Sequence, residues 1–298
     1  MKFGICLPIR TDHSIEFNID LAKKAEQLGF DSVWVSDHVV IPKKIKGTFT
    51  SVFYDPFVLL SAISSATKSI KIGTSVIVVP YRNPVVVAKM LSTLDNLSKG
   101  RLIFGVASGW LQEEFDALDA DFKNRGRITD EYLGAILNLW SEENPSFSGE
   151  FVEFSEIDFY PKPYNGRIPN IWVGGSSKFA IRRSLNYGSG WQPTWVSPEK
   201  MVTLIESLQN IANGMGRNLE DFTLSVRNRI KIGDHVDSRE ISAVPSYMFP
   251  NSWDEIEKDI DAYLKLGVEH ILFDPATDKE EETFELINTI SCKVLDHF

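Results

Sequence analysis

Short runs of strand-forming residues alternate with longer runs of helical period from one end of the sequence to the other, and this alternation limits the possible folds more than any other feature. In such a chain each helix returns the backbone so that the next strand lies parallel to the last. We expect eight strands, at residues 3–7, 32–38, 70–79, 102–107, 171–173, 190–192, 223–229 and 268–273. Eight such units predict an α/β fold, a (β/α)8 TIM barrel that spans residues 1–298 as one domain.

An open, doubly wound sheet is the alternative that the same alternation permits. Its usual signature, a GxGxxG turn after the first strand, is absent from this sequence, which favours the barrel. We expect insertions after strands 2, 4 and 7: an irregular segment at 39–55, a small β-hairpin within 147–159, and a second irregular segment at 230–251. Long loops inside a compact fold are commonly functional, so the two irregular segments are expected to cover the substrate.

Several helix starts can also be predicted from capping residues. Asn83 and Ser197 each precede a proline, and this order places a capping side chain before the first helical position. Ser252 and Glu255 have the spacing of a capping box, which predicts a helix that continues to Lys265.

The formal net charge of −10 limits the partners of the protein. An acidic chain repels nucleic-acid phosphates and anionic lipid headgroups, so neither is an expected partner. No run approaches the roughly 20 apolar residues of a membrane-spanning helix. The two cysteines, Cys6 and Cys292, form no metal motif or disulfide framework, and the N-terminus enters a strand without the pattern of a signal peptide. We therefore expect a cytoplasmic protein without a metal site.

The run at 32–38 begins as an alternating strand and ends on Ser36, Asp37 and His38. In a parallel barrel, ligands bind beyond the carboxyl ends of the strands. A histidine exchanges protons near neutral pH, and a neighbouring carboxylate can orient it or bind a polar edge of a ligand. We therefore predict Asp37 and His38 as the centre of an active site. The alternative is that Ser36 or Asp37 caps a helix and that His38 is a solvated loop residue.

Three further strand ends have an unusual composition. Gly73 lies within an apolar strand. A glycine at such a position indicates a bulge or close approach by a ligand, and the alternative is that it belongs to an ordinary buried strand. The small residues at 105–109 would let a flat ligand approach the backbone, and Trp110 either stacks on that ligand or simply packs. The segment 174–177 is a Gly-Gly-Ser-Ser turn between a strand and a helix, whose free amides suit a phosphate, although such turns also serve as plain connections.

In combination these strand ends resemble the bacterial luciferase-like family of flavin and deazaflavin oxidoreductases. The last third of the chain fits that family by architecture more than by motif. The segments that carry the resemblance, in the family's order, are 28–38, 72–76, 98–106, 109–110, 113–115, 172–176 and 187–191.

The resemblance implies a barrel that holds a flavin-type ring at the carboxyl ends of its strands, with coenzyme F420 as the expected cofactor and FMN as the alternative. It implies that His38 handles a proton beside the ring, and that the bond between Ser75 and Val76 is a non-prolyl cis peptide that bulges behind the ring. The residues that it assigns to cofactor binding are Asp37, Ser75, Val76, Ser108, Gly109, Gly174, Gly175 and Ser176.

The implied function is F420-dependent hydride transfer to or from a small organic substrate, and the alternative is FMN-dependent monooxygenation with reduced flavin and O2. A phosphate-binding barrel lyase or isomerase and a non-catalytic flavin-binding protein are more distant alternatives. The family's habit implies a homodimer, and a monooxygenase would also need a reductase partner. In one departure, Trp110 occupies the position of a glutamate acid in the sugar-phosphate dehydrogenase branch, and that role is not transferred to Glu113 or Glu114.

Overall fold

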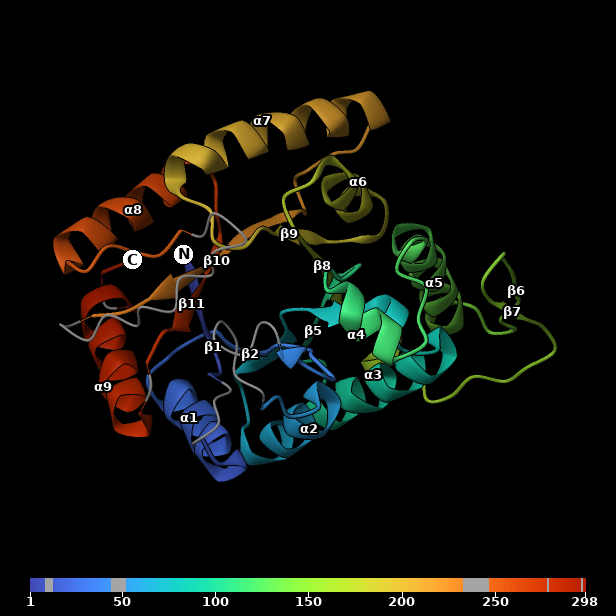
Figure 1. The fold of residues 1–298 in the computed structure, drawn as a ribbon, viewed down its shortest axis with the longest axis horizontal. Helices are drawn as coiled ribbons and strands as arrows, with labels where there is room; N and C mark the ends of the chain where they lie inside the picture. Colours follow the sequence, from blue (N-terminus) through green and yellow to red (C-terminus); the bar gives the residue numbers. More distant parts are fainter. Residues whose placement is uncertain (9–12, 44–51, 233–246, 278, 296) are drawn as a thin grey trace.

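The predicted (β/α)8 barrel is confirmed by the computed structural model, which describes residues 1–8, 13–43, 52–232, 247–277, 279–295 and 297–298. The barrel strands are β1 (Lys2–Cys6), β2 (Ser32–Val35), β3 (Lys71–Thr74), β5 (Leu102–Ala107), β8 (Asn170–Gly174), β9 (Gly190–Gln192), β10 (Thr223–Ile230) and β11 (His270–Pro275). They pair in parallel in the order β3-β2-β1-β11-β10-β9-β8-β5 (Figure 1). A further pairing of β3 with β5 closes the ring, so the open-sheet alternative is excluded.

The third expected strand, 70–79, is divided in two. β3 ends at Thr74, and the short strand β4 (Ile77–Val78) then continues beside β5. The peptide bond between Ser75 and Val76 is cis, as the resemblance implies, and it forms the bulge that separates the two strands.

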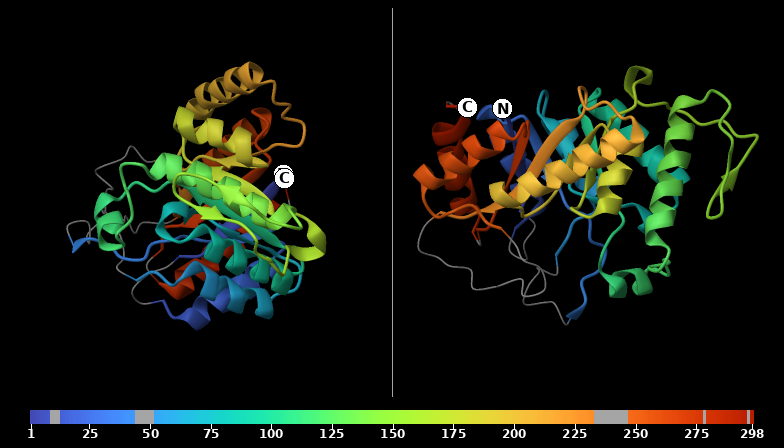
Figure 2. Two further views of the ribbon diagram at one scale, coloured as in Figure 1. Left: turned by 90° about the vertical axis from the view of Figure 1, so that its right-hand side faces the viewer. Right: turned by 90° about the horizontal axis from the view of Figure 1, so that it is seen from above.

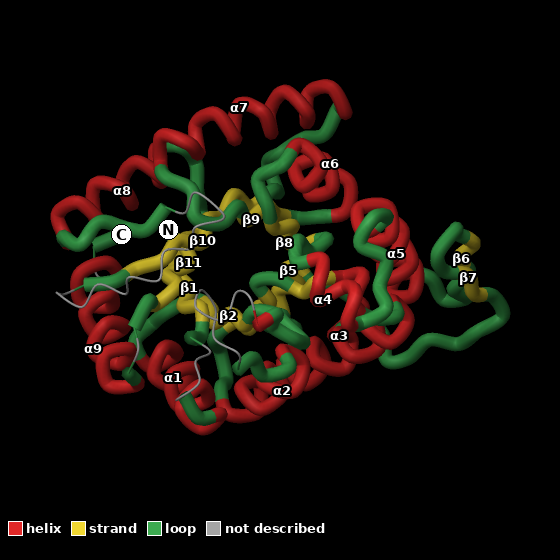
Figure 3. The backbone as a smooth tube through the Cα atoms, in the orientation of Figure 1, coloured by secondary structure: helices red, strands yellow, loops and turns green. Residues whose placement is uncertain are grey.

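Helices surround the barrel on the outside, and Figure 3 shows them in red around the yellow strands. They are α1 (Ile15–Gln27), α2 (Pro56–Ala66), α3 (Pro84–Ser98), α5 (Arg125–Ser141), α6 (Lys178–Tyr187), α7 (Pro198–Met215), α8 (Trp253–Lys265) and α9 (Glu280–Ile290). The short helix α4 (Gln112–Ala117) instead lies beside the end of β5, where its Glu114 bonds to the residues that follow β2. Among the described residues, none of these helices has the length and apolar character needed to cross a bilayer.

The helix starts were predicted in part. The side chains of Asn83 and Ser197 accept backbone hydrogen bonds at the starts of α3 and α7, as expected. The helix predicted from Ser252 to Lys265 is confirmed as α8, but the capping box does not form: within the described residues 247–265, the Ser252 side chain makes no capping hydrogen bond. The backbone carbonyl of Ser252 instead accepts the amides of Glu255 and Ile256 at 3.2 and 2.9 Å, so these donors are already satisfied.

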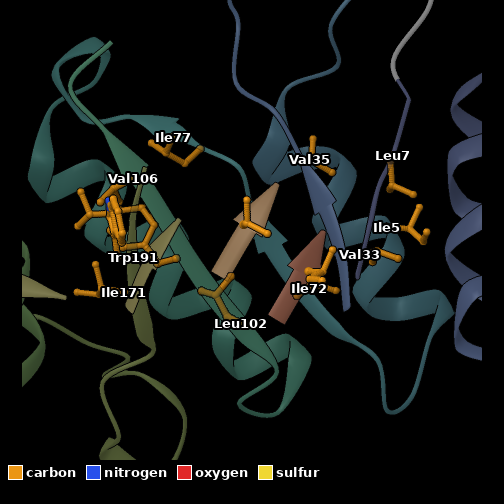
Figure 4. Packing of buried hydrophobic residues seen from close by; sticks show 14 of the residues in the cluster. Ile5, Leu7, Val33, Val35, Ile72, Ile77, Leu102, Val106, Ile171 and Trp191 are labelled. Atoms are coloured by element: carbon orange, nitrogen blue, oxygen red, sulfur yellow. The ribbon is translucent and has the colours of Figure 1, made fainter. Parts of the chain in front are cut away.

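The apolar core has two parts, because alternate residues of each strand face opposite sides of the barrel wall. The larger part lies between strands and helices and includes Val33 and Val35 (Figure 4). The smaller part fills the barrel interior, where the indoles of Trp34 and Trp172 stack with ring centroids 5.1 Å apart. A Cβ at Gly73 would lie 2.3 Å from the Trp34 ring. Gly73 therefore makes room for this indole, which answers the question that the sequence left open.

The insertion after β5 contains the predicted hairpin, formed by β6 (Phe147–Ser148) and β7 (Glu153–Phe154), which pair antiparallel. Figure 2 shows it extending away from the barrel beyond α5. The two segments expected to cover the substrate lie partly outside the described residues, since 44–51 and 233–246 are not described.

Candidate active site

All of the predicted site residues lie at one end of the barrel, because every barrel strand is parallel and each residue follows or ends a strand. Side-chain and backbone contacts connect the ends of three strands, β3, β8 and β9. Gly174 is paired with Gln192 across β8 and β9, and Gln192 accepts a hydrogen bond from the Ser75 hydroxyl. A Cβ at Gly174 would lie 2.9 Å from Val76, so the bulge after β3 packs directly against β8.

His38 is held by a buried carboxylate that the sequence analysis left without a role. Nδ1 of His38 lies 2.9 Å from Oε2 of Glu114, which belongs to α4. The same oxygen accepts a hydrogen bond from the hydroxyl of Tyr81 at 2.8 Å, and the His38 ring contacts Phe53 edge to face at 4.8 Å. His38 is thus an oriented side chain in a packed setting, which excludes the alternative of a solvated loop histidine.

Glu114 is fully buried and is satisfied on both oxygens. Its Oε1 accepts the backbone amides of Val39 and Val40 at 2.6 and 3.2 Å, which ties the segment after β2 to α4. Burial alone would raise the pKa of Glu114, but the hydrogen bonds from His38 and Tyr81 and the amide of Val39 outweigh it and lower that pKa. An ionised carboxylate only accepts hydrogen bonds, so Nδ1 of His38 carries the proton that is directed at Glu114, which fixes the tautomer of the neutral ring.

Asp37 is buried and forms a two-point ion pair with Arg82, at 2.7 Å to Nη1 and 2.8 Å to Nη2. It also accepts the amide of Val78 at 3.0 Å. Burial alone would lower the pKa of Arg82, but the contacts with Asp37 raise it, so the guanidinium keeps its charge. Asp37 therefore links the segment that follows β4 to the end of β2, and Arg82 balances its charge there.

Ser75 stands in a polar network under the barrel mouth. The carbonyl oxygen of Ser75 accepts hydrogen bonds from Nη1 of Arg227 at 2.6 Å and from the hydroxyl of Ser36 at 3.1 Å. Arg227 lies on β10 and forms an ion pair with Asp274 of β11 at 2.8 Å. Burial tends to lower the pKa of Arg227, but Asp274 outweighs it, so the pKa is raised and the guanidinium keeps its charge. A fixed cation thus holds the carbonyl at the bulge between β3 and β4.

Ser108 and Gly109 follow β5 and turn sharply there. Gly109 has φ +77°, and a Cβ at this position would lie 2.7 Å from both Phe115 and Val78. Only glycine fits this turn without displacing its neighbours. Trp110 is 51% exposed, which excludes the alternative that it fills the core.

The turn after β8 precedes the ten-residue helix α6. Gly175 has φ +103°, and both Gly175 and Ser176 are exposed. The hydroxyl of Ser177 caps α6 by accepting the amide of Ala180 at 3.1 Å. The amide of Gly175 donates to the carbonyl of Gln192 at 3.3 Å, so a phosphate here would rely on the later amides of the exposed turn and on the positive end of the α6 dipole.

The residues at this end of the barrel fit a flat ring that carries a phosphate. The glycines at 109 and 174 let the side chains of Phe115, Val78 and Val76 pack closely against the backbone at this end of the barrel, and the turn at 174–176 suits the anion. In addition, Nε2 of the buried Gln192 finds no hydrogen-bond partner among the described residues. No group of three or more potential metal ligands occurs in the part of the chain that the structure describes.

Six polar residues of the site were not predicted: Tyr81, Arg82, Glu114, Gln192, Arg227 and Asp274. Glu114 carried a usable signal, since Leu111, Glu114 and Phe115 follow helical spacing and the two apolar neighbours are buried. A charged residue within a buried stripe needs a partner. Arg227 carried a similar signal inside a buried strand, whereas nothing in the local sequence distinguishes Arg82 from a surface arginine.

Comparisons with known proteins agree with this geometry. The sequence profile of the luciferase-like monooxygenase family matches residues 1–263. The F420-dependent glucose-6-phosphate dehydrogenase of Amycolatopsis mediterranei is 35% identical over 233 residues, which cover 74% of this chain and 67% of that protein.

Two further similarities concern monooxygenases. The FMNH2-dependent dimethylsulfone monooxygenase of Pseudomonas fluorescens is 32% identical over 175 residues, which cover 57% of this chain and less than half, 46%, of that protein. The crystal structure of a monooxygenase from Streptomyces bottropensis superposes with a TM-score of 0.84, covers 100% of this chain and 99% of that one, and has 21% identity, so it shows a shared fold.

Proposed function

The chain belongs to the luciferase-like monooxygenase family of oxidoreductases, and we propose that it uses coenzyme F420 to move a hydride to or from a small organic substrate. The similarity to the F420-dependent dehydrogenase supports this choice most directly, because it extends over 74% of the chain, against 57% for the FMNH2-dependent relative. The sequence Ser36-Asp37-His38 at the end of β2 favours the same branch. Residues 1–298 would act as one domain.

In this proposal the protein positions the cofactor and the substrate and excludes water between them. Val76, Ser108 and Gly109 would line the ring, with Asp37 behind them, and the turn at 174–176 before α6 would bind the phosphate. When bound, the deazaflavin supplies a two-electron centre that accepts or gives a hydride.

We assign to His38 the transfer of a proton to or from the substrate. Because Nδ1–H of His38 is directed at Glu114, exchange with the substrate falls to Nε2. In the oxidation of an alcohol, Nε2 would take the hydroxyl proton while the hydride leaves the carbon, and it would return that proton in the reverse reaction. The Glu114 carboxylate would stabilise the imidazolium that forms, so both the tautomer and the charge depend on this pair.

FMN-dependent monooxygenation with O2 is the second candidate. It is favoured by one observation, the 32% identity with an FMNH2-dependent monooxygenase. A protein of this kind needs reduced flavin, so a separate reductase would be its partner. In either case we propose a cytoplasmic homodimer that acts on small molecules and does not bind nucleic acid, in keeping with its net charge of −10.

Titration of the purified protein with F420 and with FMN, followed by cofactor fluorescence, tests the proposal. We expect F420 to bind at micromolar concentration and more tightly than FMN. Preferential binding of reduced FMN, with O2 consumption, would instead support the monooxygenase. Binding of neither cofactor at micromolar concentration would refute both candidates.

A further inference from the structure

Gln192 ends β9 and is the one residue of that strand whose side chain joins the network at the barrel mouth. Its neighbour Trp191 packs in the outer core and donates its indole N–H to the carbonyl of Gly175 at 2.7 Å. Since side chains alternate along a strand, Gln192 faces the opposite way, into the barrel. There it meets Ser75 at 2.6 Å, and the side chain is completely buried.

The orientation of the Gln192 amide is fixed by the chemistry of its neighbours. Arg227 can only donate, and its Nη1 lies 3.2 Å from the hydroxyl of Ser75, which therefore accepts. With Oε1 of Gln192 facing Ser75 at 2.6 Å, the single hydroxyl proton of Ser75 has an acceptor, which it would lack if the NH2 group faced it instead. The NH2 group of Gln192 consequently points away from Ser75.

That NH2 group is buried and has no acceptor among the described residues. A second buried amide shows the usual situation. Asn228 on β10 donates from Nδ2 to the hydroxyl of Tyr263 at 2.8 Å and to the carbonyl of Val196 at 3.2 Å, and it accepts the Val196 amide at 3.0 Å. Buried donors are usually paired, and the Gln192 NH2 group is one of a few exceptions among the described residues, lying at the end of the barrel where the ring is proposed to bind.

We propose that Gln192 binds the cofactor ring, with Nε2 donating a hydrogen bond to a carbonyl oxygen or unprotonated nitrogen on the ring's polar edge. The inference rests on the proposed function and adds a binding residue to it. Asp274 holds Arg227, which donates a hydrogen bond to the Ser75 hydroxyl, and Ser75 in turn orients the Gln192 amide by donating to it. In this arrangement Gln192 would hydrogen-bond the cofactor ring. Deazaflavin and flavin rings share this polar edge, so the contact serves either cofactor.

The test is Gln192→Glu, which keeps the shape of the side chain and the acceptor for Ser75 but replaces the donor with a second acceptor. We expect its dissociation constants for F420 and FMN to rise about tenfold or more at neutral pH. Riboflavin, which lacks the phosphate, should lose affinity by the same factor as FMN, because the lost contact is to the ring. A merely structural defect has no reason to preserve that ratio.

Asn228→Asp is the matched control, since it alters an equally buried amide on the neighbouring strand that faces the helices. We expect Asn228→Asp to lower the thermal midpoint while cofactor affinity stays within a few-fold of wild type. If wild-type protein binds cofactor and Gln192→Glu binds it equally well, this inference fails alone. If the wild-type protein binds neither F420 nor FMN, the inference fails together with the proposed function.

Discussion

Oε2 of Glu114 lies 2.9 Å from Nδ1 of His38, and this contact joins a strand end to a helix 76 residues further along the chain. Glu114 is completely buried and lies on α4, whereas His38 follows β2. The carboxylate therefore sets the tautomer of His38 and directs its ring from a distant part of the sequence. Both effects lead to measurable consequences.

Glu114→Gln should lower the rate of turnover while leaving the affinity for the cofactor within a few-fold. The amide keeps the size of the side chain but loses the charge that balances a protonated His38, so the cost is expected in kcat. Steady-state kinetics and cofactor titration measure the two quantities separately. Asp116→Asn, an exposed carboxylate on the same helix, is the control and should change neither.

His38→Ala should lower turnover more than Glu114→Gln does, and should likewise leave cofactor affinity within a few-fold. If Glu114 acts through His38, the double variant will be no slower than His38→Ala, because the carboxylate then has nothing to orient. Additive losses would show that Glu114 contributes by another route. Unchanged turnover in a chemistry-limited assay would remove His38 from the mechanism.

Local patterns predicted most of the fold, because strands buried on both faces and capped helices leave their signatures in a few consecutive residues. The site was predicted less completely. Its strand ends could be located, but the partners of His38 and of Arg227 lie 76 and 47 residues away, and no local period encodes such pairs. The cis bond after Ser75 followed only from the family resemblance.

Gly73 is another case that the local sequence could not decide, since it fitted both close approach by a ligand and ordinary packing in a buried strand. Choosing between ligand contact and plain packing requires knowing that Trp34 is paired beside it in the barrel. That register belongs to the assembled sheet, and the sequence around Gly73 does not contain it.

Asp274→Ala should lower the free energy of unfolding by about 3–5 kcal/mol, because it leaves the guanidinium of Arg227 largely buried without its counter-charge. Urea denaturation measures this loss. Glu150→Ala is the control: it removes the partner of Arg127 in a well-exposed ion pair, and such pairs contribute about 0–1 kcal/mol. Equal effects of the two substitutions would contradict the view that Arg227 depends on Asp274.

Gly73→Ala and Gly214→Ala should change stability in opposite directions. The added methyl group at 73 would lie 2.3 Å from the buried ring of Trp34, and overpacking of this kind costs about 1–3 kcal/mol. At Gly214, on the exposed side of α7, a Cβ meets nothing within 4 Å. Alanine there should raise the free energy of unfolding by about 0.5–1 kcal/mol, as expected from helix propensity. Thermal and urea unfolding of both variants test the pair.

Glu26 provides a pH-dependent prediction away from the site. Its Oε1 accepts the amides of Lys68, Ser69 and Ile70, so a single carboxylate fastens α1 to the loop before β3. Partial burial would raise the pKa of Glu26, but these hydrogen bonds outweigh it and lower the pKa from 4.5 to about 2. The folded state therefore binds this proton less tightly than the unfolded state does.

It follows that the stability contributed by Glu26 is fully present above about pH 4.5 and is lost as the pH falls toward about 2. Glu26→Gln should accordingly be less stable than wild type at neutral pH, and the difference should shrink steadily across that acidic window. Urea denaturation at a series of pH values measures it, with Glu16→Gln in the first turn of the same helix as the control. A difference that stays constant down to about pH 2 would show that the amide hydrogen bonds to Glu26 do not depend on its charge.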